Sequence, residues 1–516
     1  MPDGTDAHTP PTEVSRAAGG TVGRLFAATA RLWPQRTALI QGERRLSYGA
    51  LAERVDRLAS VMRARGVGRG DRVGLLSRND MAFIEVELAA AGIGAITASL
   101  NWRLSPDELA QCIDLAEPGL LVVQPEYAEI LAGAAPRGTP RLVIGDDYEA
   151  ALAQAPGAPP AVDLEPEDGL VIIFTSGTTG LPKGALISHR AMLARAMIFA
   201  AELAAPAADT FVAWTPLFHM GANDFALATL LRGGTVVIVD GYRPRELITA
   251  IETHRIHYLP LIPGMIGEFL DALEAAKAQP RGLGMIGAMA DLVPRQQLAE
   301  ITARLRAPYL NTFGSTETGI PPATANFLAI GEVPRSLAKR QNGFCEVRLV
   351  DADDNEVPDG QPGELAMRGP SLFSGYWRND RANRESFRNG WFHMGDVFRR
   401  LPDGGLEFVD RVKYLIKSGG ENIYPAEIEQ HILADPRIAE AVVVRKPDPR
   451  WGEIPVVFAA RNDDDLTAEA VIETCRGRLA GYKLPKEVHF IDLDAFPRST
   501  TGKIQRHELE ARWHED

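Results

Sequence analysis

The stretch that decides the fold is "TSGTTGLPKG" at residues 175–184, which directly follows the apolar run "GLVIIF" at 169–174. Its ten residues include three glycines, four hydroxyl side chains and Lys183. Glycines allow successive backbone N–H groups to converge on an anion, while hydroxyls add donors and the lysine adds positive charge. The spacing is not that of a Walker loop, because Leu181 and Pro182 precede the lysine. The stretch predicts a phosphate-binding loop at the end of a buried strand.

Outward from this loop, apolar runs alternate with helical patterns in both directions. Helical spacing is present at 48–67 and 81–96, and short apolar runs that indicate strands are at 71–77, 119–123, 169–174, 234–240, 258–262 and 308–313. This alternation predicts an α/β fold with layered, largely parallel sheets. Residues 343–410 change to short alternating β segments. The last hundred residues mix helices and strands, which predicts a separate α+β domain.

Size and composition limit the class of protein. A chain of 516 residues is too long for one ordinary core, so at least two domains are expected. The formal net charge of −13 excludes a general electrostatic attraction to nucleic acid or to an anionic membrane surface.

Cys112, Cys345 and Cys475 have neither disulfide nor zinc spacing, which favours buried thiols over a catalytic one. Residues 1–19 read as a flexible tail rather than a signal peptide. No stable membrane insertion is expected, and a cytoplasmic location is predicted.

Four further motifs follow the loop in a fixed order. They are "NTFGSTETG" (311–319), "WFHMGDVF" (391–398), "DRVKYLIKSGGENIYP" (410–425) and "PRSTTGKIQR" (497–506). Together with 175–184 they make the chain, from about residue 20 to its end, resemble the adenylate-forming (ANL) superfamily. That superfamily contains acyl-CoA and aryl-CoA synthetases, adenylation domains of peptide synthetases and beetle luciferases.

The resemblance implies an architecture. A tail at 1–19 would precede a large N-terminal adenylation domain at 20–410, built from several subdomains with layered α/β sheets and a small β-barrel-like part. A small, mobile α+β domain would follow at 411–516.

The resemblance also implies how ATP is held. The phosphates would be bound by Thr175, Ser176, Gly177, Thr178, Thr179, Gly180 and Lys183. Phe313, at a position where the family usually has Tyr, would stack on adenine, and Thr316 would meet the α-phosphate. Glu317 would hold Mg²⁺, a metal that carboxylates bind well beside phosphates. Asp396, preceded by Met394 where the family usually has Thr, would accept hydrogen bonds from the ribose hydroxyls. Arg411 would contact ribose or phosphate, and the catalytic Lys503 would bridge the substrate carboxylate and the α-phosphate.

A second set of residues is implied for the thiol donor, coenzyme A. Lys413 occupies the hinge position of the family, and Lys417 faces the active site in the thioester-forming state. Gly419 and Gly420 would line the tunnel for pantetheine. Contacts with the CoA nucleotide are implied for Trp451, Tyr482, Lys486 and Arg103.

The acid pocket is implied by "PLFHMGAN" (216–223) and "MIGAMA" (285–290). By the resemblance, His219 would be the gating residue beside the carboxylate, and the nearby wall residues are small: Gly221, Ala222, Gly287, Ala288 and Ala290. The segment lacks the Asp with which peptide-synthetase domains pair an α-amino group. Small apolar walls suit a bulky hydrophobic acid. We therefore expect an aromatic, alicyclic, polycyclic or fatty acid rather than acetate.

The sequence thus predicts an AMP-forming acid–thiol ligase. It would activate a hydrophobic carboxylic acid with ATP to an acyl-adenylate, then form a thioester with CoA and release AMP and pyrophosphate. Two alternatives stay open: a ligase that loads the phosphopantetheine arm of a carrier protein, and a catalytically silent acyl-nucleotide binding protein. A luciferase-like oxygenase is formally compatible as well, because a fold alone does not fix function. The exact acid and a homodimeric state are left open.

Overall fold

The computed structural model describes residues 19–136, 138–176, 182–324, 326–419, 421–498 and 504–514. The chain divides into two compact units. The first contains the residues up to Glu346 together with Arg368–Glu385, and the second contains Val347–Met367 and the residues from Ser386 onward. Each unit has its own sheets and its own apolar core.

The first unit contains a six-stranded sheet that ends at the predicted phosphate loop. Its strands, in spatial order, are β6 (Arg141–Val143), β5 (Leu120–Val123), β3 (Arg72–Leu76), β4 (Ile96–Leu100), β7 (Gly169–Ser176) and β8 (Pro182–Ser188). All pairs are parallel except β7 with β8, which are antiparallel. The central strands are buried along their length, as expected when both faces of a parallel sheet are covered.

An eight-stranded sheet forms the other large layer of this unit. In spatial order it contains β16 (Phe327–Leu328), β13 (Tyr309–Leu310), β12 (Leu283–Ile286), β11 (Ile256–Leu259), β9 (Thr210–Ala213), β10 (Thr235–Ile238), β1 (Thr37–Gln41) and β2 (Arg44–Ser47). The centre is parallel, and the pairs at the two edges are antiparallel. A separate two-stranded hairpin is formed by β14 (Phe313–Ser315) and β15 (Gly319–Ala323).

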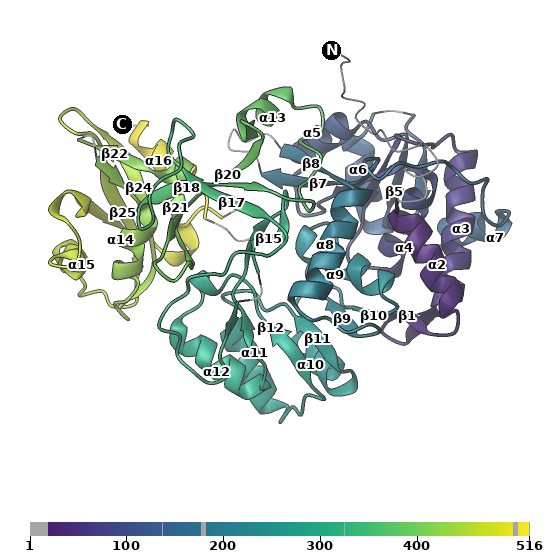
Figure 1. Cartoon of the computed structure of the whole chain (residues 1–516), viewed down its shortest axis with the longest axis horizontal. Coiled ribbons are helices and arrows are strands. Elements are labelled where there is room, and N and C mark those ends of the chain that lie inside the picture. The colour runs from purple at the N-terminus through teal and green to yellow at the C-terminus, as the bar shows by residue number, and fades with distance from the viewer. Residues whose placement is uncertain are drawn as a thin grey trace, which may run out of the picture. The chain divides into compact units, whose positions relative to one another are not determined.

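Helices cover these sheets. They are α2 (Val22–Leu32), α3 (Tyr48–Ala64), α4 (Met81–Ile93), α5 (Pro106–Ala116), α6 (Ala128–Ala134), α7 (Asp146–Gln154), α8 (His189–Glu202), α9 (Met220–Leu231), α10 (Pro244–Thr253), α11 (Ile266–Ala275), α12 (Arg295–Leu305) and α13 (Asp380–Ser386). Figure 1 shows α10, α11 and α12 beside β11 and β12, and the apolar side chains of these elements share one core. Helix α9 is buried almost all round, because most of its residues are apolar and its polar Asn223 and Asp224 are bonded to Glu87 and Arg195.

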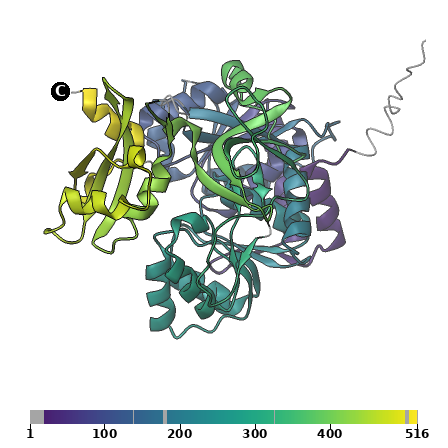
Figure 2. The ribbon, with the colours of Figure 1, turned by 60° about the vertical axis from the view of Figure 1, so that its left-hand side comes forward.

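The second unit contains two five-stranded sheets. The first is antiparallel and contains β17 (Glu346–Val350), β18 (Pro362–Arg368), β19 (Phe387–Arg388), β20 (Trp391–Arg400) and β21 (Leu406–Arg411). The second contains β22 (Ile416–Ser418), β23 (Glu421–Ile423), β24 (Ile438–Asp448), β25 (Gly452–Arg461) and β26 (Glu487–Phe490). Its helices are α14 (Pro425–Ile432), α15 (Ala468–Cys475) and α16 (Arg506–Ala511). Figure 2 shows this yellow C-terminal part as a sheet with helices against it.

The C-terminal sheet is buried on both faces because alternate residues of β25 point to opposite sides. Val457 and Ala459 join a core with α14 and α15, whereas Phe458 and Ala460 join a second core with Leu509 of α16. This sheet with helices on both faces is the α+β part that the sequence predicts.

Most predicted elements are confirmed, and two predicted strands need correction. The run at 308–313 is not one strand, because β13 ends at Leu310 and β14 begins at Phe313 in a different sheet. Thr312 lies between them and its hydroxyl donates to the carbonyl of Ala323 at 2.6 Å. The run at 258–262 is strand only to Leu259, where Pro260 removes a backbone donor.

Candidate functional site

The two ends of the predicted phosphate loop are held together by a β-hairpin. Thr175 on β7 lies directly opposite Lys183 on β8, and the Thr175 hydroxyl donates to the Lys183 carbonyl at 3.4 Å. The tip of the loop, with the predicted contacts Gly177, Thr178, Thr179 and Gly180, lies outside the described residues. The side chain of Ser176 does too. The hairpin therefore brings the first hydroxyl of the motif and its lysine side by side.

Tyr376 connects this hairpin to the second motif, and sequence reasoning did not identify it. The segment that contains it is bonded to β8, with Ser374 N–H donating to the Leu186 carbonyl at 2.8 Å and Trp377 N–H donating to the Gly184 carbonyl at 2.7 Å. The Tyr376 hydroxyl donates to Oε1 of Glu317 at 2.9 Å, and Lys183 Nζ lies 5.0 Å from the centre of its ring. The only local signal was an aromatic residue after a glycine, which is common in turns.

The second motif forms the turn between β14 and β15. The Thr318 hydroxyl accepts from Ser315 N–H at 2.9 Å and donates to the Pro321 carbonyl at 2.6 Å, which fixes the turn. Thr316 is 9% exposed, whereas Phe313 and Glu317 are partly exposed. A side chain at Gly314 would place its Cβ 2.0 Å from the Gly319 carbonyl oxygen, so this close turn requires glycine. Glu317, Tyr376 and Lys183 thus form one cluster.

This cluster fits a Mg²⁺ ion that is shared with phosphates rather than one enclosed by protein. Among the described residues, no three His, Cys, Asp or Glu side chains gather as a metal site. Mg²⁺ characteristically uses one or two carboxylates and completes its shell with phosphate oxygens and water. Glu317 alone satisfies that requirement, and the tyrosine leaves its other oxygen available for a metal.

The predicted acid wall begins at the N-terminus of α9. His219 is the N-cap residue of this helix, and its Nδ1 accepts from the Gly221 N–H at 3.1 Å. The His219 side chain is exposed and Gly221 is partly exposed, but Ala222 is completely buried. His219 and Gly221 are therefore accessible to a ligand here, whereas Ala222 packs inside the unit.

The opposite predicted wall follows β12. Gly287 has φ +85°, and a Cβ there would lie 2.1 Å from the Tyr309 ring. The Tyr309 hydroxyl donates to the Ala288 carbonyl at 2.8 Å and holds this loop in place. Met289 adopts φ +51°, an uncommon conformation for a residue with a side chain. Ala288 is partly exposed, but Ala290 is completely buried in the core below.

In the second unit, the third and fourth motifs bring Asp396 and Arg411 together. The two residues are paired directly across β20 and β21, and Arg411 Nε lies 3.0 Å from an oxygen of Asp396. Asp396 is 3% exposed, whereas Arg411 is exposed. Glu364 on β18 accepts from the N–H of Gly395 at 3.1 Å and so fixes the residue before Asp396. Glu364 is a supporting residue that the sequence motifs do not reveal.

The predicted thiol-side residues also cluster in the second unit. Gly419 has φ +59°, donates its N–H to the Trp451 carbonyl at 2.7 Å, and would place a Cβ 2.8 Å from the Trp451 ring. Lys417 is exposed on β22, and its N–H donates to Glu453 at 2.7 Å. The Trp451 side chain is 44% exposed. This arrangement presents an exposed aromatic face beside a glycine-lined turn.

The remaining predicted residues are spread over both units. Lys413 is exposed in a short 3₁₀ turn (Val412–Tyr414) after β21, with its Nζ 4.8 Å from the centre of the Tyr414 ring. Tyr482 and Lys486 are exposed near β26, and Arg103 is exposed over the Trp102 ring in the first unit. Gly420 and Lys503 lie outside the described residues.

The cysteines carry no sign of catalytic chemistry. Cys112 and Cys475 are buried, and Cys345 is partly buried. Burial raises the pKa of the Cys112 and Cys345 thiols to about 12 and also raises the pKa of Cys475. A reactive cysteine needs a lowered pKa, so these thiols are structural. Within the described ranges, none of the helices has the length and apolarity to cross a membrane.

Comparisons with known proteins agree with this arrangement. Residues 26–377 match the AMP-binding enzyme family, and residues 427–503 match the C-terminal domain of AMP-binding enzymes. A feruloyl-CoA synthase from Amycolatopsis sp is 34% identical, over 94% of this chain and 97% of that protein. An indoleacetate–CoA ligase from Aromatoleum aromaticum is 36% identical, over 93% of this chain and 96% of that protein.

Solved structures are similar over the same length. The o-succinylbenzoate CoA synthetase of Bacillus subtilis, in complex with its acyl-adenylate intermediate, superimposes with a TM-score of 0.82 at 25% identity, covering 94% of this chain and 97% of that one. The ATP-bound MatB of Rhodopseudomonas palustris gives a TM-score of 0.82 at 26% identity, covering 96% and 99%. By its two family domains and its relatives along almost the whole length, the chain belongs to the adenylate-forming superfamily of AMP-binding enzymes.

Proposed function

We propose that the protein is an AMP-forming acid–CoA ligase: it activates a carboxylic acid with ATP and transfers the acyl group to coenzyme A. The observation that carries this proposal is the cluster of Lys183, Tyr376 and Glu317, which places a cation and a carboxylate on either side of one tyrosine. A cation and a carboxylate that can bind a metal ion are the groups needed to hold the phosphates of ATP. The relatives support the thiol acceptor, because those named above are CoA synthases or ligases.

In the first half-reaction, the acid carboxylate attacks the α-phosphorus of ATP and pyrophosphate leaves. Thr175, Lys183 and the loop between them bind the phosphates, and Thr316 contacts the α-phosphate. Mg²⁺ held at Glu317 supplies charge neutralisation when bound. Lys503 adds a second cation at the reacting groups. Preorganised positive charge of this kind is the main source of rate acceleration where negative charge builds up.

In the second half-reaction, the CoA thiolate attacks the acyl carbonyl and AMP leaves. Asp396 and Arg411, an ion pair between neighbouring strands β20 and β21, bind the ribose. Trp451 offers an aromatic face for the CoA adenine, and the absence of a side chain at Gly419 lets the Trp451 ring lie against this turn. Rotation about Lys413 exchanges the two half-reaction sites.

The acid is bulky and hydrophobic in this proposal. Its carboxylate lies near His219, and Gly221, Gly287 and Ala288 leave space for a large group. Two relatives support an aromatic acid, because by their names they act on feruloyl and indoleacetate groups. A cytoplasmic location and a homodimer stay predictions.

The test is pyrophosphate release with MgATP over a panel of carboxylic acids, with and without CoA. We expect release with aromatic or other bulky acids, little with acetate, and acyl-CoA only when CoA is added. Release without any acyl-CoA would instead favour a carrier-protein acceptor, which a phosphopantetheinyl carrier protein in place of CoA would reveal. An absence of release with every acid would contradict the proposal.

A further inference from the structure

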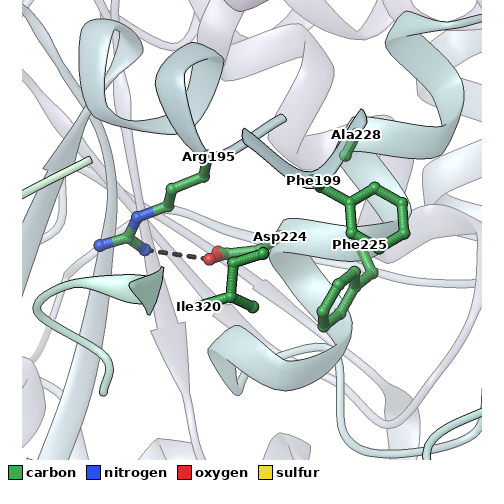
Figure 3. Close-up of a pocket in the computed structure, with 6 residues that line it drawn as sticks. All are labelled: Arg195, Phe199, Asp224, Phe225, Ala228 and Ile320. Carbon is green, nitrogen blue, oxygen red and sulfur yellow. Dashed lines mark hydrogen bonds and ion pairs between the residues drawn. The ribbon is translucent and has the colours of Figure 1, made fainter. Parts of the chain in front are cut away.

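A small cavity lies in the first unit between α8, α9 and β15 (Figure 3). Its volume is about 10 Å³, which is room for one water molecule or one hydroxyl group. It is lined by Arg195, Phe199, Asp224, Phe225, Ala228 and Ile320. None of these residues belongs to the motifs that bind ATP or CoA.

One end of the cavity is formed by a buried ion pair. Arg195 and Asp224 are 3% and 7% exposed, and Arg195 donates to Oδ2 of Asp224 at 3.1 Å. The Nε and Nη2 atoms of Arg195 donate to the carbonyls of Ser371 at 3.1 Å and Thr316 at 3.0 Å. Among the described residues, Arg195 therefore reaches only one of the two oxygens of Asp224.

The second carboxylate oxygen of Asp224 has no hydrogen-bond donor among the described residues. This atom, Oδ1, is buried. A buried carboxylate oxygen without a donor is costly, so its position in a protein interior indicates that a donor is supplied from elsewhere. The cavity is the space from which that donor can reach it.

The rest of the cavity is apolar. The rings of Phe199 and Phe225 meet edge to face with their centres 4.9 Å apart, and Ala228 and Ile320 complete the wall. Figure 3 shows the Arg195 guanidinium directed at Asp224, with the two phenylalanine rings on the other side of the carboxylate. A matching ligand group is thus a hydrogen-bond donor attached to an apolar body.

The cavity and the proposed acid pocket share helix α9. Asp224 follows His219 by five residues along α9, or about 7.5 Å of helix axis. The Phe225 ring is 4.7 Å from that of Tyr258, whose hydroxyl donates to the Gly287 carbonyl at 3.1 Å. Phe225, which lines the cavity, is therefore linked through Tyr258 to the wall at Gly287 by direct side-chain contacts.

We infer that Asp224 is a specificity-determining residue of the acid pocket: its Oδ1 accepts a hydrogen bond from a hydroxyl or ring N–H at the end of an aromatic acid that is distant from the carboxylate. This inference rests on the proposed ligase function. An acid without such a donor leaves Asp224 unpaired in an apolar surrounding, and sites of this kind reject the analogue strongly. Arg195 is a positioning residue, which holds the Asp224 carboxylate and fixes its ionic partner.

The first experiment compares matched acids on the wild-type protein. The pairs are para-hydroxycinnamate with cinnamate and para-methoxycinnamate, and indoleacetate with N-methylindoleacetate. The readouts are kcat/KM for pyrophosphate release and the ligand-induced shift in Tm. We expect the donor-bearing acid to be preferred by about 100-fold or more in at least one pair. Acyl-CoA formation with no donor preference in either pair would overturn the inference but leave the ligase function intact. No pyrophosphate release with any acid would overturn both.

The second experiment changes the acceptor. In Asp224→Asn, the amide oxygen can stay on Arg195 while the NH₂ group faces the cavity. An indole N–H can only donate, so the preference for indoleacetate over N-methylindoleacetate should be lost. The double variant Arg195→Met with Asp224→Leu removes the pair without leaving a lone charge, and should bring the preference within about threefold of unity. Glu85→Gln is the matched control, because Glu85 is a buried carboxylate paired with an arginine, Arg54, and neither residue lines the cavity. An unchanged preference in both Asp224 variants would contradict the role given to this residue.

Discussion

At the scale of single residues, Glu87 has the strongest electrostatic signature. It is completely buried in α4, and Asn223 Nδ2 donates to both of its oxygens at 2.9 and 2.8 Å. Burial raises its pKa from 4.5 to about 8, although the Asn223 hydrogen bond opposes this. The Glu87 side chain is therefore largely protonated at neutral pH. Its proton can serve Asn223 Oδ1, which has no donor among the described residues.

The Glu87 pKa sets a pH dependence of stability. The pKa of Glu87 is higher in the folded protein than in the unfolded chain. Protonated Glu87 therefore stabilises the fold fully below about pH 4.5, and this stabilisation is lost as the pH rises through 8. We expect the free energy of unfolding to fall between pH 5.5 and pH 8.5, by on the order of 1.4 kcal/mol per pH unit until the pH reaches the folded pKa of about 8. Glu87→Gln should abolish most of this slope, since a neutral amide can exchange two hydrogen bonds with Asn223.

Urea denaturation at the two pH values measures this effect, and Glu85 supplies the control. Glu85 lies two residues earlier, is also buried, and pairs with Arg54 at 2.6 Å. Glu85→Gln breaks an ion pair, so it should destabilise the protein at both pH values. A Glu87→Gln variant with the wild-type pH slope would show that Glu87 is ionised in the folded state.

For Tyr376 we predict an effect on the use of ATP rather than on the stability of the protein. Tyr376→Phe removes the donor to Glu317 and keeps the ring beside Lys183. A hydrogen bond to a charged group contributes about 1.5–3 kcal/mol, so kcat/KM for MgATP should fall about 10-fold or more. Tm should change little. The steady-state rate as a function of MgATP measures this, with Tyr242→Phe as a control whose hydroxyl donates to the remote Met265 carbonyl. Equal rates for both variants would contradict a role for Tyr376 at the phosphates.

At the scale of elements, the strand pair β20–β21 depends on a charged cluster beside it. Glu364 accepts from Arg388 at 3.0 Å and lies 3.2 Å from His393, which is 6% exposed. Burial alone would raise the pKa of Glu364, but these two partners outweigh it and the pKa is lowered. Asp354 adds a second carboxylate, 3.3 Å from Arg388. This cluster fixes Gly395, and through it the position of Asp396.

A carboxyl group whose pKa is lower in the folded protein than in the unfolded chain stabilises the fold when the pH is above its unfolded pKa. This stabilisation is lost as the pH falls through its folded pKa. We therefore expect Glu364→Gln to be less stable than wild type at pH 7 and to lose less stability on acidification below about pH 4. Because Asp396 is proposed to hold ribose, KM for ATP should rise more than kcat falls. Unfolding followed by circular dichroism at several pH values tests the predicted stability, and the steady-state rate as a function of ATP tests the predicted KM and kcat. Arg381→Gln, whose partner Glu385 is exposed, should leave both unchanged.

The same elements show what sequence can predict. Strand β7 was predictable, because a continuous apolar run before a glycine-rich loop is a local signal, whereas its partner β8 was not predicted. The division of 308–313 between two sheets was not, because it depends on the contact of Thr312 with Ala323, eleven residues away. Tyr376 was missed for the same reason, since its partners Glu317 and Lys183 are far away in the sequence. The Arg195–Asp224 pair is likewise visible only in three dimensions.

At the scale of the whole molecule, the two compact units each hold part of the proposed chemistry. The first contains the phosphate hairpin, Glu317 and the acid walls, and the second contains Asp396, Arg411 and the Trp451 face. Lys503, outside the described residues, belongs by its motif to the C-terminal domain. A small domain that carries residues for two different steps can serve both only by changing its position, which is the purpose of a hinge.

This division predicts that the two half-reactions can be impaired separately. Lys503→Ala should slow acyl-adenylate formation by 100-fold or more, the scale on which removing one charge-stabilising group acts. It should hardly affect thioester formation from a supplied acyl-adenylate. Trp451→Ala should do the opposite, raising KM for CoA about 10-fold because an aromatic platform is lost while adenylation is kept. Pyrophosphate release without CoA and acyl-CoA formation from the supplied adenylate separate the two steps. In this proposal each of the two residues acts in only one position of the small domain, so each can affect only one step. If either variant slowed both steps equally, the proposal that the small domain alternates between two positions would be contradicted.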